Sequence, residues 1–110
     1  MDYNDKFGNC YLRYTISVME GKWKWIILWK IHTCPGIRFN KLHSELAPIA
    51  HRTLSDQLKQ LEESSLIHRE QFQEIPPHVE YSLTPKGLSL VPILEMMYQW
   101  GEINSGESLL

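Results

Sequence analysis

The segment from Leu66 to Gly87, LIHREQFQEIPPHVEYSLTPKG, constrains the fold of this chain more than any other. Two extended runs flank the Pro76-Pro77 turn, and the second run, 79–83, alternates apolar and polar residues as a half-buried strand does. Thr84-Pro85 then has the pattern of a helix start, a capping hydroxyl followed by a proline at the first helical position. A helix that ends near Ser64 leads directly into this hairpin. This order predicts a winged helix-turn-helix, which presents one helix and one hairpin tip to the same ligand, usually a DNA duplex.

The rest of the chain predicts a fold that is α+β but mostly α. We expect helices over about 11–19, 22–32, 41–46 and 51–64, with Asn40 as the N-cap of the third after a short extended piece at Arg38-Phe39. The second of these helices is apolar at almost every position and should be buried on most sides. The fourth has one narrow apolar stripe, made by Leu54, Leu58 and Leu61, which should face the core.

A last helix is expected from Pro85 to about Glu102, and it carries more apolar residues than one core needs. One stripe consists of Leu88, Val91, Leu94 and Tyr98, and a second of Leu90, Ile93, Met97 and Trp100. Two adjacent stripes suggest one face for the domain itself and one for a partner. Pro92 lies inside the segment and should kink the helix.

The length of 110 residues suggests a single domain over 10–104, between a flexible arm at 1–9 and a tail at 105–110. The longest apolar run, 25–29, is too short to span a membrane, so we expect no membrane partner. The first residues carry acids where a signal peptide would carry bases, which favours a cytoplasmic protein. Two cysteines are too few for a disulfide scaffold.

The net charge of −2 at first argues against a nucleic-acid partner, but the charges are unevenly distributed. Between 38 and 60 the bases are Arg38, Lys41, Arg52 and Lys59, against Glu45 and Asp56. From 87 to 110 there are three acids and no Lys or Arg. Because binding follows local potential more than net charge, a phosphate-facing middle would produce this pattern. Chance clustering would produce it too.

Several motifs together resemble the HxlR-type regulators, a branch of bacterial winged-helix transcription factors similar to the MarR group. They are GKWKWIIL at 21–28, RFNKLHSEL at 38–46, RTLSDQLKQLEESSLI at 52–67 and PPHVEYSLTPKG at 76–87. The resemblance covers roughly residues 10–101. It implies a homodimer on a pseudo-palindromic operator, with helix 51–64 in the major groove and the hairpin tip, 73–78, beside the minor groove. Where the family usually has glycine and then Ser or Thr, this chain has Pro48 and Ala50, so Ala50 cannot cap through its side chain.

The resemblance also implies that the first and last helices join the subunits. The expected interface residues are Tyr11, Leu12, Leu90, Ile93, Met97 and Trp100. A cysteine just before the first helix senses oxidants or electrophiles in some family members, and Cys10 occupies that place. Its effector would then be a small oxidant or electrophile. Cys34 has no such counterpart and is expected to be inert, although it could bridge to Cys10 if the Cα atoms came within ~7 Å.

The outward side of helix 51–64 is the predicted DNA-reading surface. It combines Arg52, Ser55, Asp56 and Lys59, a mixture that can meet guanine, phosphate and base edges. An ordinary solvated helix face is the alternative, which the hairpin and the family resemblance disfavour. Four more residues have open roles. Arg38 and Lys41 could contact the DNA backbone or only solvent, and His51 could cap, pack or contact phosphate. His78 could reach the duplex or sit in a rigid turn without a ligand.

Two alternatives remain at this stage. Trp23, Trp25 and Trp29 with Tyr11 and Tyr14 could line an effector pocket, although aromatic residues at helical spacing are more often core and dimer seam. The same winged surface could instead bind an acidic protein. Enzyme chemistry is not expected, because the sequence has no phosphate-cradling glycine loop, no nucleophile elbow and no carboxylate pair in a recognisable setting. Neither a cofactor nor a metal site is expected, since the His and Cys residues lack paired ligand spacing.

Overall fold

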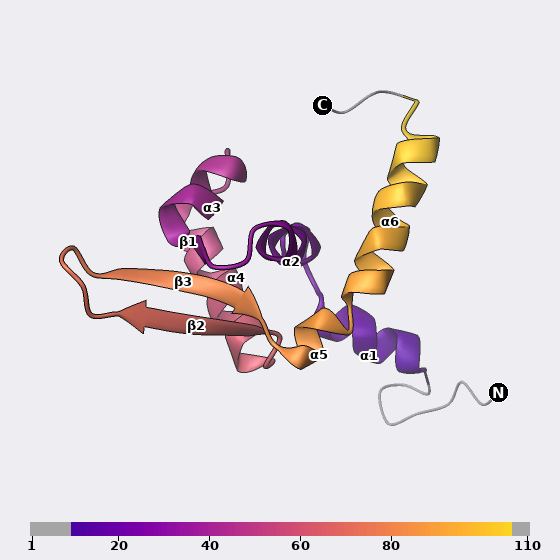
Figure 1. The fold of residues 1–110 in the computed structure, drawn as a ribbon. Coiled ribbons are helices and arrows are strands. Elements are labelled where there is room, and N and C mark those ends of the chain that lie inside the picture. Colours follow the sequence, from indigo (N-terminus) through magenta and orange to yellow (C-terminus); the bar gives the residue numbers. More distant parts are fainter. Residues whose placement is uncertain (1–9, 107–110) are drawn as a thin grey trace.

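The computed structural model describes residues 10–106 and shows a helical body from which a small sheet projects (Figure 1). The elements are α1 Tyr11–Val18, α2 Lys24–Thr33, β1 Ile37–Arg38, α3 Phe39–Glu45, α4 His51–Glu63, β2 Ile67–Phe72, β3 His78–Leu83, α5 Pro85–Leu88 and α6 Val91–Asn104. This is the predicted winged helix-turn-helix, with mostly α content. The expected arm at 1–9 and residues 107–110 of the expected tail lie outside the described residues.

The sheet has three antiparallel strands in the order β1-β3-β2, so the hairpin is confirmed but gains a third strand. Ile37 pairs with Tyr81, and the Gly36 N–H donates to the Tyr81 carbonyl at 3.0 Å. Gly36 has φ +79°, which glycine adopts at no steric cost. The expected extended piece is therefore 37–38 and not 38–39. A two-residue strand is set by its partner and leaves almost no periodic signal in the sequence.

The core lies where α2, α4 and the inner face of the sheet meet. Ile27, Leu28 and Ile31 of α2 are at most 1% exposed, and the predicted stripe of α4, Leu54, Leu58 and Leu61, is at most 2% exposed. That stripe is confirmed. Burying such side chains removes apolar surface from water, which stabilises the fold at roughly 25 cal/mol per Å².

The helix α2 begins at Lys24, later than the expected residue 22, and it is not buried on every side. Ile26 is 46% exposed, whereas Lys24 is only 6% exposed. The Lys24 Nζ donates a hydrogen bond to the Val18 carbonyl at 3.3 Å. This bond compensates the burial of a charged group and ties the end of α1 to the start of α2.

The expected N-cap at Asn40 was wrong. Arg38 is the N-cap of α3, with extended backbone, and the helix already begins at Phe39. Pairing with β3 holds Ile37 and Arg38 extended, so the chain turns into the helix directly after the strand. Phe39 packs against the core from the first helical position. Tertiary packing thus overrides the local capping preference of Asn40.

The single kinked helix expected after Thr84 is instead two helices, α5 and α6. Pro92 stands in the first turn of α6, where its missing N–H leaves no hydrogen bond unmade. Thr84 caps α5 as predicted, because its Oγ1 accepts from the Gly87 N–H at 3.0 Å. A Cβ on Gly87 would overlap the Leu66 carbonyl oxygen, so this glycine lets α5 pack against the start of the hairpin.

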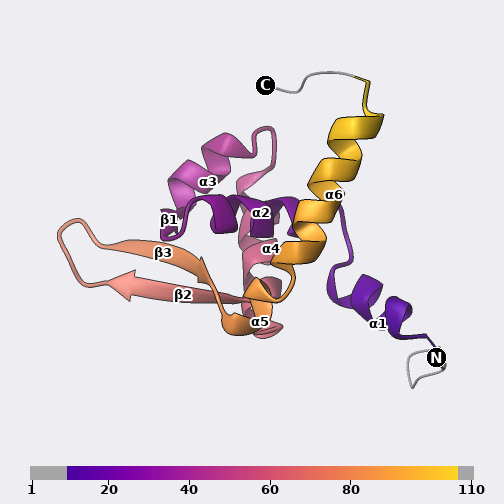
Figure 2. The ribbon, with the colours of Figure 1, turned by 45° about the vertical axis from the view of Figure 1, so that its right-hand side comes forward.

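The break also changes which apolar residues of this segment are buried. Val91 and Leu94 enter the core, but Leu88 is 52% exposed and lies outside it. Tyr98 is 56% exposed and stacks on Trp29 at 5.2 Å between ring centroids. The C-terminal turns of α6 rise clear of the body in both views (Figures 1 and 2). Among residues 10–106, no helix combines the length and apolar character needed to cross a membrane.

Candidate nucleic-acid interface

The turn between α3 and α4 fixes where the recognition helix begins. Ile49 is 4% exposed and anchors the turn in the core, and its carbonyl oxygen lies 3.0 Å from His43 Nε2. Ala50 is the N-cap, with extended backbone, and as predicted it offers no side-chain cap. His51 packs its ring against Phe39 at 4.7 Å and lies 5.7 Å from the ring of His43. Of the three roles open for His51, packing is the one that the structure shows.

The predicted reading face of α4 is on the surface. The side chains of Arg52 and Asp56 are 94% and 62% exposed, and Arg52 Nε lies 4.0 Å from Asp56 Oδ2. Lys59 is exposed and Ser55 is half-buried. An exposed ion pair at this distance is weak, so the Arg52 side chain can leave Asp56 for another partner at little cost. The four residues therefore lie on one accessible side of one helix.

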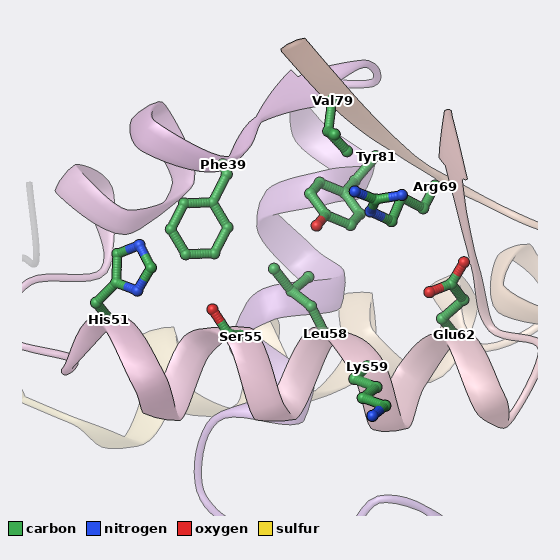
Figure 3. Close-up of a pocket in the computed structure, with 9 residues that line it drawn as sticks. All are labelled: Phe39, His51, Ser55, Leu58, Lys59, Glu62, Arg69, Val79 and Tyr81. Atoms are coloured by element: carbon green, nitrogen blue, oxygen red, sulfur yellow. The ribbon is translucent and has the colours of Figure 1, made fainter. Parts of the chain in front are cut away.

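A cleft of about 510 Å³ separates α4 from the inner face of the sheet. Its walls carry apolar residues from α3, α4 and β3 and polar residues from α4 and β2. The lining residues are Phe39, His51, Ser55, Leu58, Lys59, Glu62, Arg69, Val79 and Tyr81 (Figure 3). Three predicted site residues, His51, Ser55 and Lys59, thus lie at one cleft. Arg52 and Asp56 do not line it.

Arg69 is a cleft residue that sequence reasoning missed. It pairs with Tyr81 across β2 and β3, and both side chains line the cleft. A signal was available in the sequence: Arg69 lies two positions after Ile67, so the period of a strand puts both on the same face. Ile67 is buried, and Arg69 is exposed where that face extends past the core.

His78 is engaged within the hairpin, as the second of its two open roles would have it. Its side chain is 12% exposed, its Nε2 lies 2.9 Å from Glu80 Oε2, and its Nδ1 lies 3.7 Å from Glu74 Oε2. The ring also stacks on Phe72 at 4.7 Å between centroids and 10° between planes. His78 is therefore held inside the hairpin by three neighbours.

The two other predicted backbone-contacting residues are exposed, but on different elements. Arg38 sits on β1 opposite Glu80 of β3. Lys41 is in α3, and its Nζ lies 3.8 Å from Cys34 Sγ. Neither lines the cleft, so the structure does not bring them together with Lys59 and Arg69.

The predicted interface helices carry a broad exposed apolar surface. Tyr11 and Leu12 of α1 are 67% and 66% exposed, and Ile93, Met97 and Trp100 of α6 are 43%, 45% and 69% exposed. Leu90 differs, because it is half-buried against the core. Met96 and Ile103, which the sequence analysis did not single out, are 70% and 79% exposed. Apolar surface of this extent on two terminal helices is typical of an interaction site.

The tryptophans belong to the body of the domain. Trp23, Trp25 and Trp29 are half-buried and pack against the core. None of the three lines the cleft beside α4. The structure therefore favours the core interpretation of this aromatic group over the effector pocket.

The two cysteines lie at helix ends. Cys10 is the N-cap of α1 and Cys34 the C-cap of α2, and both are partly exposed. Cys10 therefore stands beside the exposed apolar surface of α1, and Cys34 beside Lys41 of α3.

The fold and the exposed face of α4 define a helix-turn-helix transcriptional regulator. More specifically, the chain belongs to the HxlR family, because the family model described as HxlR-like helix-turn-helix matches residues 18–108. A protein of Fusobacterium mortiferum, provisionally named regulatory protein MalR, is 45% identical over 95 residues, or 86% of this chain and 90% of that protein. The uncharacterized HTH-type transcriptional regulator BH0655 of Halalkalibacterium halodurans is 44% identical over 83% of this chain and 80% of its own length.

Solved structures agree with this assignment. The redox regulator HypR in its reduced form has a TM-score of 0.82 and 38% identity, over 87% of this chain and 94% of that one. Its oxidized form has a TM-score of 0.81, over 91% of this chain and 100% of that one. The family and the winged-helix, MarR-like fold are confirmed.

Proposed function

We propose that this regulator binds a pseudo-palindromic operator as a homodimer and reads it with α4. The observation that carries the proposal is the position of Arg52, Ser55, Asp56 and Lys59 on one accessible side of α4, next to an exposed hairpin. Arginine can bond guanine O6 and N7, and Ser and Asp can meet base edges or water. A dimer would set two such helices about one DNA turn, ~34 Å, apart.

The dimer is supported by the exposed apolar residues of α1 and α6. These helices carry Tyr11, Leu12, Ile93, Met97 and Trp100 on their surfaces. Leu90 is the N-cap of α6. A second copy that buried this surface would remove it from water, which is the main favourable term in most protein association. An operator that overlapped a promoter would then be blocked by the bound dimer.

Selection of bound fragments from sheared genomic DNA of the host tests this function. Recovery of an inverted repeat whose half-sites lie about one turn apart is the expected result. Binding must also weaken as salt rises, because phosphate contacts release counterions. No enrichment, with no salt-dependent binding to duplex DNA, would contradict the proposal and favour the alternative, a winged-helix module that binds an acidic protein.

A regulatory role for Cys10 is a second proposal, with an oxidant or electrophile as the effector. It is supported by the partial exposure of Cys10 at the start of α1, where it adjoins the proposed subunit interface. The related HypR is a redox regulator solved in reduced and oxidized forms. Modification at this place would shift the dimer toward a geometry that the operator does not fit, for which about 1–3 kcal/mol is enough.

Repeating the DNA selection with and without reductant gives the first readout for this thiol. The variant Cys10→Ser should bind DNA as the parent does but lose any response to diamide or a quinone. Cys34→Ser is the matched control and should keep the response. If Cys10→Ser still responds, Cys10 is not the sensor.

A further inference from the structure

The hairpin is acidic toward its tip, where a phosphate contact would need positive charge. Residues 70–83 contain Glu70, Glu74 and Glu80 and no Lys or Arg. His78 is engaged with Glu74 and Glu80 and is only 12% exposed on its side chain. Ile75, at the turn itself, is fully exposed. Carboxylates repel phosphates, so this tip is poorly suited to lie in a minor groove.

The base of the hairpin has the opposite character. Arg69 extends from β2 beside Tyr81, and Lys59 lies on α4 across the same cleft (Figure 3). The Ser55 hydroxyl lies on the α4 wall between His51 and Lys59 along the helix. Cations on the two walls and a hydroxyl on the α4 wall are groups that commonly bind the DNA backbone.

The form of the duplex indicates which part of the DNA would lie at this cleft. With α4 in a major groove and the hairpin over the next minor groove, the sugar-phosphate strand between those grooves crosses the space between α4 and the sheet. That space is the cleft that Arg69 and Lys59 line.

We propose that the hairpin engages DNA through its base and not through its tip. A phosphate of the strand between the grooves binds at the mouth of the cleft, between Arg69 and Lys59, and the acidic tip stays clear of the duplex. Glu62 lines the same cleft and weakens binding of this phosphate. This inference rests on the proposed operator binding and assigns Arg69 as a further DNA-contacting residue.

The test measures the affinity for the selected operator fragment by fluorescence anisotropy over a series of KCl concentrations. Arg69→Gln should weaken binding about tenfold and, since a dimer has two such sites, reduce the salt slope by about two. Arg69→Lys keeps the charge and should retain the slope. Lys86→Gln is the charge-matched control on α5, where Lys86 Nζ donates to the Ser64 carbonyl, and it should bind as the parent does.

Two acidic residues give independent readouts. Glu74→Lys at the tip should leave the affinity at 0.15 M salt and the salt slope unchanged. At that salt concentration, exposed charges more than ~8 Å apart are largely screened from each other. Glu62→Gln in the cleft should raise the affinity for the operator fragment severalfold. If Arg69→Gln does not fold, this variant alone tests whether a phosphate binds at the cleft.

Different failures have different meanings. Unchanged binding by Arg69→Gln and Glu62→Gln, or a steeper slope and tighter binding by Glu74→Lys, would overturn the assignment of the hairpin base while leaving operator binding intact. A parent protein without salt-dependent binding to the fragment would remove the proposed function, and this inference with it.

Discussion

Two apolar stripes of similar sequence character have opposite fates in this protein. The leucines of α4, Leu54, Leu58 and Leu61, are at most 2% exposed, whereas Ile93, Met97 and Trp100 of α6 are 43–69% exposed. The first stripe is covered by α2 and the sheet of the same chain. The second extends past α2, and its distal turns stand clear of the body (Figure 2). An apolar stripe thus marks a face that needs a cover, but it does not say whether the cover is the same chain.

The largest expected effect comes from opening the covered stripe. Leu54→Ala should lower the free energy of unfolding by about 3 kcal/mol, because it removes fully buried methyl groups and leaves a cavity. Urea denaturation at a fixed protein concentration measures this loss. Leu88→Ala, at a site 52% exposed, is the matched control and should cost much less. Equal losses would show that the exposed fraction of a side chain does not predict the cost of removing it.

The next effect concerns the uncovered stripe. Trp100→Ala should weaken dimer association by about 2 kcal/mol, or roughly 30-fold, if this tryptophan is an interface anchor. Analytical ultracentrifugation over a concentration series gives the dissociation constant. Ile75→Ala removes a fully exposed apolar side chain at the hairpin tip and should leave association unchanged. A dimer insensitive to Trp100→Ala would mean that α6 is covered by something other than a second copy.

Removing the Arg52 side chain from the first turn of α4 should affect DNA binding alone. Arg52→Ala is expected to weaken operator binding by about 1–3 kcal/mol and relax selectivity at one position per half-site, since its side chain is 94% exposed. The dimer should persist in ultracentrifugation. Lys22→Ala, on the exposed loop before α2, removes a comparable charge and should not alter selectivity. Unchanged operator affinity for Arg52→Ala would exclude the proposed contact.

The smallest effect tests the junction between the covered and uncovered regions. Thr84 caps α5 and donates its hydroxyl to the Ser65 carbonyl at 2.6 Å. Thr84→Ala should therefore cost about 1 kcal/mol of stability, and Thr84→Ser should recover most of it. Thermal unfolding of the three proteins measures the difference. A Thr84→Ala protein as stable as the parent would show that Pro85 at the first helical position and the packing of Gly87 are enough to hold the start of α5.

Much of the candidate site could be predicted from local pattern. The stripe of α4 fixed its outward face, and so Arg52 and Asp56 were placed correctly on the surface. Arg69 was missed because the sequence alone does not show that β2 continues beyond the core, where Arg69 lines a cleft together with residues of α4. For His78 the sequence left a contact with the duplex and a rigid turn both open, because it does not show that Glu74, Glu80 and Phe72 surround the ring.

The motifs of the sequence resembled the HxlR family, and the family model confirms that membership. The sequence by itself also determined most of the order of helices and strands, the start of α4 and α5, and the burial of the α4 leucines. These features follow from period, capping and turn chemistry, which act between residues near in sequence. The tertiary structure alone decided the third strand, the early start of α3 at Phe39, the division between α5 and α6, and the cleft that joins Lys59 to Arg69. Each of these depends on contacts between segments far apart in the chain, and such contacts can override a local preference.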